Sequence, residues 1–320
     1  MITKETRGWD NYWKRGALHS CISAADKDKQ QEINDFWGGI YAQFPDEIAS
    51  LDIGTGNGLL PSLAVTYANE QAYSWEIHGV DLANIDPVAD VPEAKDLLDQ
   101  INFQGRIAAE DLPFAAGYFD LVTAQYAIEY SDMARSIPEI ARVLKKGGVF
   151  CAILHSHNSL VVAQNNENAQ EADYLLESDI FRECKDLLSL MLSGKEAEGG
   201  IYNQYVENLV RLSESYPSPS SLNIIPVMQN SLMEIMKLSR KYRPQQILEM
   251  VDNARRRLSE QRDLLRDLVN SALDEAKLEE LLVQLKSLNF DLVHEGRFSI
   301  GQEKGQENVM LGHYIQLKKR

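Results

Sequence analysis

The chain has 320 residues, which exceeds a typical single domain and predicts either two domains or one domain with a large insertion. Hydrophobic residues make up 44% of it and charged residues 25%, the composition of a soluble globular protein. Its 32 basic and 48 acidic residues give a net charge of −16, which repels phosphate backbones and anionic membrane surfaces. A nucleic-acid partner is therefore not expected.

Neither a membrane span nor an export signal is expected. No apolar run reaches the roughly 18 residues that a membrane-spanning helix needs. The N-terminal segment MITKETRGWDNYWKRG lacks the apolar stretch of a signal peptide. The three cysteines, Cys21, Cys151 and Cys184, form no CxxC pair, and buried or incidental thiols in a reducing compartment fit them. The expected location is the cytoplasm.

The first half of the chain alternates between strands and helices. Residues 28–45 predict a helix, and five apolar runs then predict strands: IASLDIG, YSWEIHGVDL, NFQGRIAAE, YFDLVTAQYAI and GVFCAILHS. Helical patterns lie between them in LLPSLAVTYANE, PVADVPEAKDLLDQI and MARSIPEIARVLKKGG. This alternation predicts a parallel sheet that is covered by helices on both faces.

A polar, helical segment interrupts the pattern over residues 158–273, and only SLNIIPV within it hints at a strand. One further helix and two closing strands, DLVHEGRFSIG and ENVMLGHYIQLKK, follow. The predicted fold is α/β: a doubly wound, mostly parallel seven-stranded sheet with a helical insertion after strand five. The expected domains are an N-terminal cap segment (1–32), an α/β core (33–157 and 274–320) and the insertion (158–273).

The segment LDIGTGNG, residues 51–58, joins the first strand to a helix through three glycines. Such a turn presents backbone N–H groups near a positive helix end. Asp52 would repel a diphosphate but favours a ligand with an ammonium group, and Asp81 ends the next strand, where a carboxylate can accept from a ribose diol. S-adenosylmethionine (SAM) has this chemistry, with an amine, a sulfonium, a nucleoside and no phosphate. A tight turn beside a capping or solvated acid is the alternative.

Four motifs in this order resemble the class I SAM-dependent methyltransferases. LDIGTGNG is similar to the first motif of that family, and GVDLA to its ribose-binding strand end. AAEDLPFAAGYFDLVTAQYAIEY and IARVLKKGGVFCAILH resemble the later motifs of its ubiquinone-biosynthesis-like branch. The resemblance covers residues 33–156 and, more weakly, 275–320. It implies the Rossmann-like methyltransferase fold and SAM as the cofactor.

The resemblance also implies which residues contact the cofactor. Asp52 would lie near the methionine end, Asp81 would hold the ribose, and Leu82 would lie against the adenine. Ala108 replaces an aspartate that often accepts from the adenine amine, so Glu110, Asp111 or backbone near Ala109 could take that role. The cofactor-binding residues expected are Asp52, Gly54, Thr55, Gly56, Gly58, Asp81, Leu82, Ala109, Glu110, Asp111 and Gln125.

Methyl transfer from a sulfonium needs the nucleophile, methyl carbon and sulfur in line, and a base only if the nucleophile arrives protonated. The reacting end should lie beyond the carboxyl ends of strands four and five. The candidates there are Gln125, Tyr126, Glu129, Tyr130, His155 and His157. His155 is the candidate base, and His157, Tyr126 and Tyr130 are candidate substrate residues. Structural roles, as hydrogen-bonded histidines and core aromatics, are the alternatives, and no metal site is expected because H-x-H lacks a clear third ligand.

The segment WDNYWKR, residues 9–15, combines three aromatic and two cationic side chains. Similar enzymes often fold such a segment over the SAM pocket, where Tyr12 or Arg15 could meet the ligand carboxylate. An aromatic anchor for the chain end is the alternative. In the insertion, apolar residues recur at helical spacing, so at least one face is buried. Packing within the chain is expected for that face, with a homodimer interface as the alternative. The insertion could also cap the substrate cavity. The run of arginines 255–257 is expected to be a solvated face.

These observations predict a SAM-dependent methyltransferase that transfers a methyl group to an oxygen, nitrogen or carbon of a small molecule. A binding or regulatory protein that keeps the fold, with its insertion on a partner, is the alternative from another class. An enzyme that uses the SAM site for other group transfers is a third reading, and fold alone does not separate them.

Overall fold

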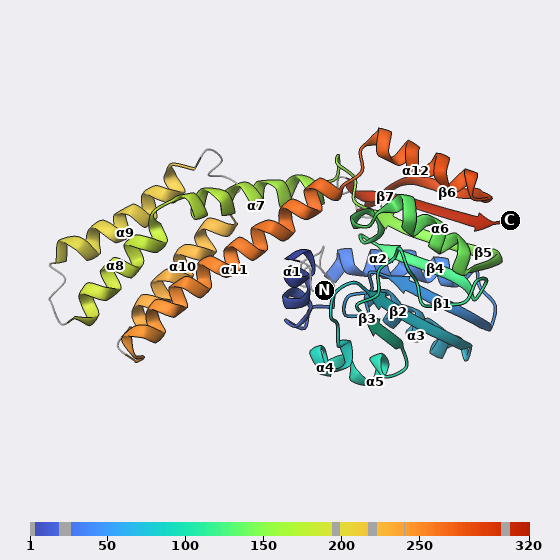
Figure 1. Ribbon diagram of the computed structural model, residues 1–320, viewed down its shortest axis with the longest axis horizontal. Coiled ribbons are helices and arrows are strands. Elements are labelled where there is room, and N and C mark those ends of the chain that lie inside the picture. The colour runs from blue at the N-terminus through green and yellow to red at the C-terminus, as the bar shows by residue number, and fades with distance from the viewer. Residues whose placement is uncertain (1–3, 19–26, 194–198, 217–222, 240, 302–307) are drawn as a thin grey trace. The chain divides into compact units, whose positions relative to one another are not determined.

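The computed structural model describes residues 4–18, 27–193, 199–216, 223–239, 241–301 and 308–320. The chain divides into two compact units (Figure 1). One comprises the residues up to 163 together with residues 270–320, and the other comprises residues 164–269. Among the described residues, no helix is both long enough and apolar enough to cross a membrane.

The first unit is built on one seven-stranded sheet with the order β3-β2-β1-β4-β5-β7-β6. The five strands β1 to β5 are parallel, and β7 runs antiparallel to both β5 and β6. The predicted fold class, including the helical insertion after the fifth strand, is therefore confirmed. The strands are β1 (Glu47–Ile53), β2 (Ser74–Asp81), β3 (Asn102–Gly105), β4 (Phe119–Gln125), β5 (Leu144–Leu154), β6 (Phe290–Ile300) and β7 (Val309–Lys319).

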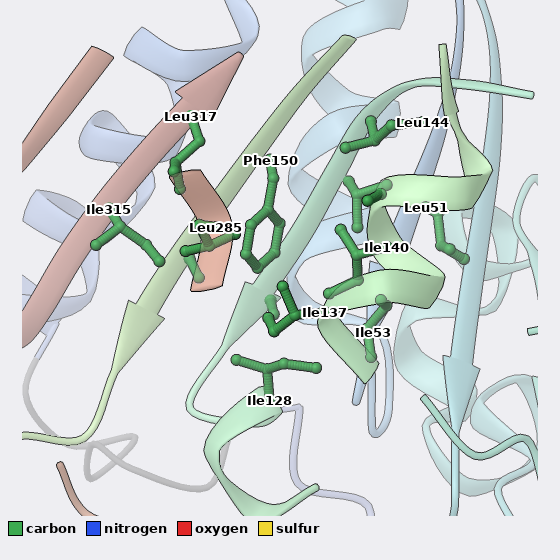
Figure 2. Close-up of a cluster of buried hydrophobic side chains, with 14 of the residues drawn as sticks. Leu51, Ile53, Ile128, Ile137, Ile140, Leu144, Phe150, Leu285, Ile315 and Leu317 are labelled. Atoms are coloured by element: carbon green, nitrogen blue, oxygen red, sulfur yellow. The ribbon is translucent and has the colours of Figure 1, made fainter. Parts of the chain in front are cut away.

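Helices bury both faces of the sheet, as the apolar strands require. On one face α2 (Lys27–Tyr41) packs on α3 (Leu59–Gln71), which contacts β1 and β2. On the other face α6 (Met133–Val143) contacts β5 and α12 (Glu275–Ser287) contacts β6. Figure 2 shows the core beneath α6, where Ile137 and Ile140 meet Phe150 of β5 and Leu285 of α12. These packed layers fix the carboxyl ends of β1, β2, β4 and β5.

Three predicted elements differ from the structure. Residues 87–98 form α4 (Pro87–Asp90), the turn η1 (Pro92–Ala94) and α5 (Lys95–Leu98) instead of one helix, because Pro92 lacks the N–H that would continue it. The segment WDNYWKR, expected before the first helix, lies largely inside α1 (Lys4–Trp13). From Ile224 on, the SLNIIPV segment is helical in α10 (Ile224–Leu238), and its residues 221 and 222 lie outside the described part.

The second unit is helical throughout its described part. Its own core joins Phe181, Leu188, Tyr205, Leu232 and Val251, all buried. The helices are α7 (Leu160–Glu177), α8 (Ile180–Leu192), α9 (Gly199–Glu214), α10 and α11 (Pro244–Ser271). The apolar residues that recur at helical spacing in α11 thus bury one face of that helix within this unit.

The two described cysteines, Cys151 and Cys184, are buried free thiols.

Candidate functional site

The loop between β1 and α3 carries the three glycines of LDIGTGNG. All three have left-handed backbone, with φ of 69° at Gly54, 52° at Gly56 and 88° at Gly58. A Cβ on Gly54 would stand 2.3 Å from Cβ of Ala127, and one on Gly58 would stand 2.6 Å from Cζ of Phe103. Both the backbone and the close packing therefore require glycine here.

Asp52 in β1 and Asp81 at the end of β2 flank this loop, and both carboxylates are buried. Oδ1 of Asp52 accepts a 2.8 Å hydrogen bond from the Thr123 hydroxyl. Oδ2 of Asp81 accepts from the Gly56 N–H at 2.8 Å, and its Oδ1 accepts from the Ala83 N–H at 2.7 Å. Burial raises the pKa of Asp52 to about 7 and that of Asp81 to about 6, against these hydrogen bonds.

The loop also holds polar atoms that the described residues leave unpaired. Oγ1 of Thr55 and Oδ1 of Asn57 are buried and have no hydrogen-bond partner in the described part of the chain. Buried polar atoms without partners are costly, and two buried carboxylates with raised pKa values gain from a cation or from hydroxyl donors. This donor and acceptor set fits a ligand with an amine and a ribose, which SAM has.

Helix α1 lies directly on the glycine loop. The ring of Trp13 is packed so closely on Gly56 that a Cβ there would stand 2.4 Å from it. Nδ2 of Asn57, which is fully buried, donates to the carbonyls of Trp13 and Ala17 at 2.8 Å each. Asp10 accepts from the Asn84 N–H at 2.8 Å and pairs with Arg106 at 2.7 Å.

Sequence reasoning placed this segment over the loop but missed Asn57 and Asp10, because their partners are distant in sequence and mostly backbone groups. Of the residues proposed to meet the ligand carboxylate, Tyr12 is half-buried with its ring 5.0 Å from that of Trp13, and Arg15 is exposed.

The ends of β4 and β5 bring several predicted residues together. The rings of Tyr126 and His155 lie 4.4 Å apart, and Tyr130 is 5.9 Å both from His155 and from Trp9 of α1. Oε1 of Gln125 accepts a 2.7 Å hydrogen bond from the Trp37 indole, which fixes the side-chain amide. The side chain of His157 is exposed.

His155 is paired with Glu129, which the sequence had placed with it among the candidates beyond the ends of strands four and five. Glu129, in the turn η2 (Ile128–Tyr130), has Oε1 at 2.7 Å from Nδ1 of His155, and both side chains are almost fully buried. The sequence predicted that both residues lie near the same edge of the sheet, and the fold reveals that the two side chains pair.

Of the expected adenine-side residues, Leu82 directly follows β2, and residues 109–111 lie in the loop that follows β3. Leu82 is 52% exposed, Ala109 is half-buried, and Oε1 of Glu110 accepts from the N–H of Asp132 at 2.8 Å. Arg142 of α6 fixes the loop by donating hydrogen bonds to the carbonyls of Leu112 at 2.8 Å and Phe114 at 2.7 Å. The same guanidinium also donates to the Glu139 carboxylate at 2.8 Å. Asp111 lies in the same loop.

Comparison with known proteins gives this core a family. Residues 51–152 match the family model described as "Methyltransferase domain". An uncharacterized methyltransferase, YcgJ, of Bacillus subtilis is 33% identical over 108 residues, which cover 33% of this chain and 40% of that protein. An uncharacterized methyltransferase of Mycobacterium bovis is 33% identical over 103 residues, 31% of this chain and 36% of that protein. The match thus spans about two fifths of the length of these relatives.

Solved structures resemble the chain at lower identity. The crystal structure of the Bacillus YcgJ protein has a TM-score of 0.42 and 15% identity, covering 89% of this chain and 97% of that one. A geranyl diphosphate C-methyltransferase from Streptomyces coelicolor, in complex with S-adenosylhomocysteine, has a TM-score of 0.36 and 17% identity, covering 48% and 66%.

The matched segment contains the glycine loop and strands β2 to β4 of the sheet. SAM is the cofactor that the sequence motifs predicted. The narrower prediction of a ubiquinone-biosynthesis-like branch stays a prediction. Residues 51–152 of this chain match the methyltransferase domain model, in line with the predicted resemblance to the class I SAM-dependent methyltransferases.

Proposed function

We propose that the protein is a SAM-dependent methyltransferase that acts on a small molecule. The observation that carries the proposal is the pair of buried carboxylates, Asp52 and Asp81, on either side of the glycine loop. Two side-chain oxygens of that loop, Oγ1 of Thr55 and Oδ1 of Asn57, have no hydrogen-bond partner among the described residues. Phosphate ligands would be repelled by these acids, whereas an amine and a ribose diol would satisfy them.

In this proposal each residue has a defined contact. Asp52 holds the amine of SAM, Asp81 accepts from the ribose hydroxyls, and Leu82 lies against the adenine. When bound, SAM supplies a methyl group that is already activated on a sulfonium. Backbone near Ala109, Glu110 and Asp111 borders the adenine side, with Thr55 and Gln125 completing the pocket.

The acceptor side is formed from the ends of β4 and β5. Tyr126, Tyr130 and His157 contact the acceptor molecule, Tyr12 lies near the cofactor end, and His155 removes a proton from an acceptor that arrives protonated. The acceptor atom is an oxygen, nitrogen or carbon. Residues 158–273 serve as a substrate cap or as the contact of a homodimer, and the protein works in the cytoplasm.

Calorimetry tests the cofactor site directly. We expect SAM and S-adenosylhomocysteine to bind the full chain, and NAD and ATP not to bind. Asp81→Asn should weaken binding of both ligands at least tenfold, because it removes the charged acceptor for the ribose. Asp99→Asn, at an exposed ion pair with Lys95, is the matched control and should change nothing.

Turnover is tested with methyl-labelled SAM and the small-molecule fraction of a cell extract, with labelled products detected by mass spectrometry. SAM binding together with a labelled product supports the proposal. Absence of SAM binding up to millimolar concentration, or tight binding of NAD instead, would contradict it.

A further inference from the structure

The side-chain amide of Gln125, at the end of β4, is held in one orientation by a buried indole. Nε1 of Trp37 lies 2.7 Å from Oε1 of Gln125. An indole N–H can only donate, so its partner must be the amide oxygen and not the amide nitrogen. Trp37 is itself held in place, because it is fully buried and its ring centroid lies 5.4 Å from that of Phe36 and 6.4 Å from that of Tyr41. The contact therefore fixes which end of the amide is turned toward α2.

The nitrogen of this amide is a donor that its neighbours do not use. Nε2 of Gln125 forms no hydrogen bond within the described part of the chain, and the side chain is half-buried. An amide nitrogen carries two N–H groups and accepts nothing. It can therefore pair with an oxygen of a ligand, most strongly with a carboxylate, and it cannot pair with an ammonium group.

Gln125 shares one face of the sheet with Asp52. The register of β1 and β4 places Asp52 beside Thr123, and their side chains are joined by the 2.8 Å hydrogen bond described above. Gln125 follows two residues later in β4, about 6.6 Å along the strand, so its side chain leaves the same face. At that level β1 has ended and the glycine loop begins with Gly54. The acid and the amide donor therefore border the same part of the loop.

An acid and an amide donor side by side match the two charged groups of an amino acid. In SAM and S-adenosylhomocysteine the amine and the carboxylate are bonded to the same carbon. Asp52 is the proposed partner of the amine, and the carboxylate next to it needs hydrogen-bond donors when it leaves water. Arg15, the cationic residue considered for that carboxylate, is exposed. A neutral donor such as Gln125 also has the advantage that it does not compete with the amine for Asp52.

We infer that Gln125 donates to the carboxylate of the cofactor, and that Trp37 is a positioning residue that keeps Nε2 of Gln125 available for it. This inference rests on the proposed function. Together with Asp52, these two residues make the site select the intact amino-acid end of SAM and not only its nucleoside. A ligand that keeps the nucleoside and the amine but lacks the carboxylate should therefore bind less tightly.

The test compares two ligands on the full chain by calorimetry at pH 8, above the pKa of Asp52 at about 7. S-adenosylhomocysteine carries both the amine and the carboxylate, and its decarboxylated analogue keeps only the amine. We expect the unmodified chain to bind S-adenosylhomocysteine at least tenfold more tightly. Gln125→Glu replaces the donor by an acid that repels the ligand carboxylate and attracts the amine, while the Trp37 indole can still donate to it. This variant should abolish or reverse the preference.

The positioning role of Trp37 has its own variant. Trp37→Phe keeps a buried ring but removes the indole N–H, so the amide of Gln125 is no longer fixed. The preference for S-adenosylhomocysteine should fall at least threefold, while binding of the decarboxylated ligand stays within twofold. Trp75→Phe is the matched control, because the Trp75 indole donates to the carbonyl of Pro45 at 2.9 Å, at the start of β2. Gln71→Glu, at an exposed glutamine, is the control for the added charge, and neither control should change either affinity.

Equal binding of the two ligands by the unmodified chain would overturn the inference, as would a preference that Gln125→Glu leaves unchanged. Equal weakening of both ligands by Trp37→Phe would show that Trp37 supports only the fold, and would overturn its positioning role. Failure of both ligands to bind the unmodified chain would instead contradict the proposed function itself, so the two failures are distinguishable.

Discussion

Below about pH 7 the carboxyl group of Asp52 carries a proton in the unliganded protein, because burial raises its pKa to about 7. An amine cation binds the ionised form, so the carboxyl must release its proton when SAM binds. The affinity for SAM should therefore rise with pH, by up to about tenfold per unit between pH 5.5 and 7, and then level off.

Calorimetry in two buffers of different ionisation enthalpy measures both the affinity and the proton released. Asp52→Asn should bind SAM more weakly and without this pH dependence. A pH-independent affinity in the unmodified chain would show that Asp52 does not pair with the amine.

The acids of the loop could be predicted from the sequence, whereas their neighbours could not. Asp52 and Asp81 stand at strand ends next to glycines, a local pattern with a direct chemical meaning. Asn57 lies in the same motif, but its partners are the carbonyls of Trp13 and Ala17, about 40 residues away. Glu129 was a candidate at the end of strand four, but its contact with His155 is seen only in the fold. A contact between a side chain and a group that is distant in sequence leaves no local pattern of residue types.

At the scale of elements, α1 is attached to the glycine loop by the hydrogen bonds of Asn57 and by the packing of Trp13 on Gly56. Asn57→Ala removes both hydrogen bonds to the end of α1, so we expect faster amide hydrogen exchange over residues 4–18 and weaker binding of S-adenosylhomocysteine. Asn69→Ala, at an exposed amide contact with Gln100, is the control and should leave both unchanged. Unchanged exchange in Asn57→Ala would mean that the packing of Trp13 on Gly56 holds α1 by itself.

The strands were easier to predict than the short helices. The strands β1, β4 and β5 each contain an apolar run, and burial on both faces produces that run directly. The short strand β3 has no such run, because its residues alternate between exposed and half-buried. The segment 87–98 follows a helical pattern, but Pro92 divides it and only the packing of Val91 and Leu98 into the core sets the turns. The position of α1 is set by its hydrogen bonds to Asn57 and by the fit of Trp13 on Gly56. The sequence of α1 alone therefore does not predict where the helix lies.

At the scale of the whole molecule, the α/β unit and the helical unit are stabilised by separate hydrophobic clusters. Leu188 lies in the core of the helical unit and Leu285 in the core beneath α6 and α12, and neither is exposed to solvent. The insertion was predictable as helical because its apolar residues recur at helical spacing without strand alternation. The function of the insertion was not predictable, because the same apolar pattern occurs on helix faces that pack within a domain, cap a substrate site or form a dimer.

A pair of matched substitutions separates the two cores. Leu188→Ala and Leu285→Ala each remove about the same buried volume, and each should lower stability by about 2–5 kcal/mol. Because cooperative opening follows the packed unit, Leu188→Ala should speed hydrogen exchange in α8 to α11 and leave binding of S-adenosylhomocysteine within twofold. Leu285→Ala should speed exchange in the sheet and weaken that binding. Equal weakening of binding by both substitutions would show that the helical unit contributes to the cofactor site, and the acceptor search should then begin with residues of that unit.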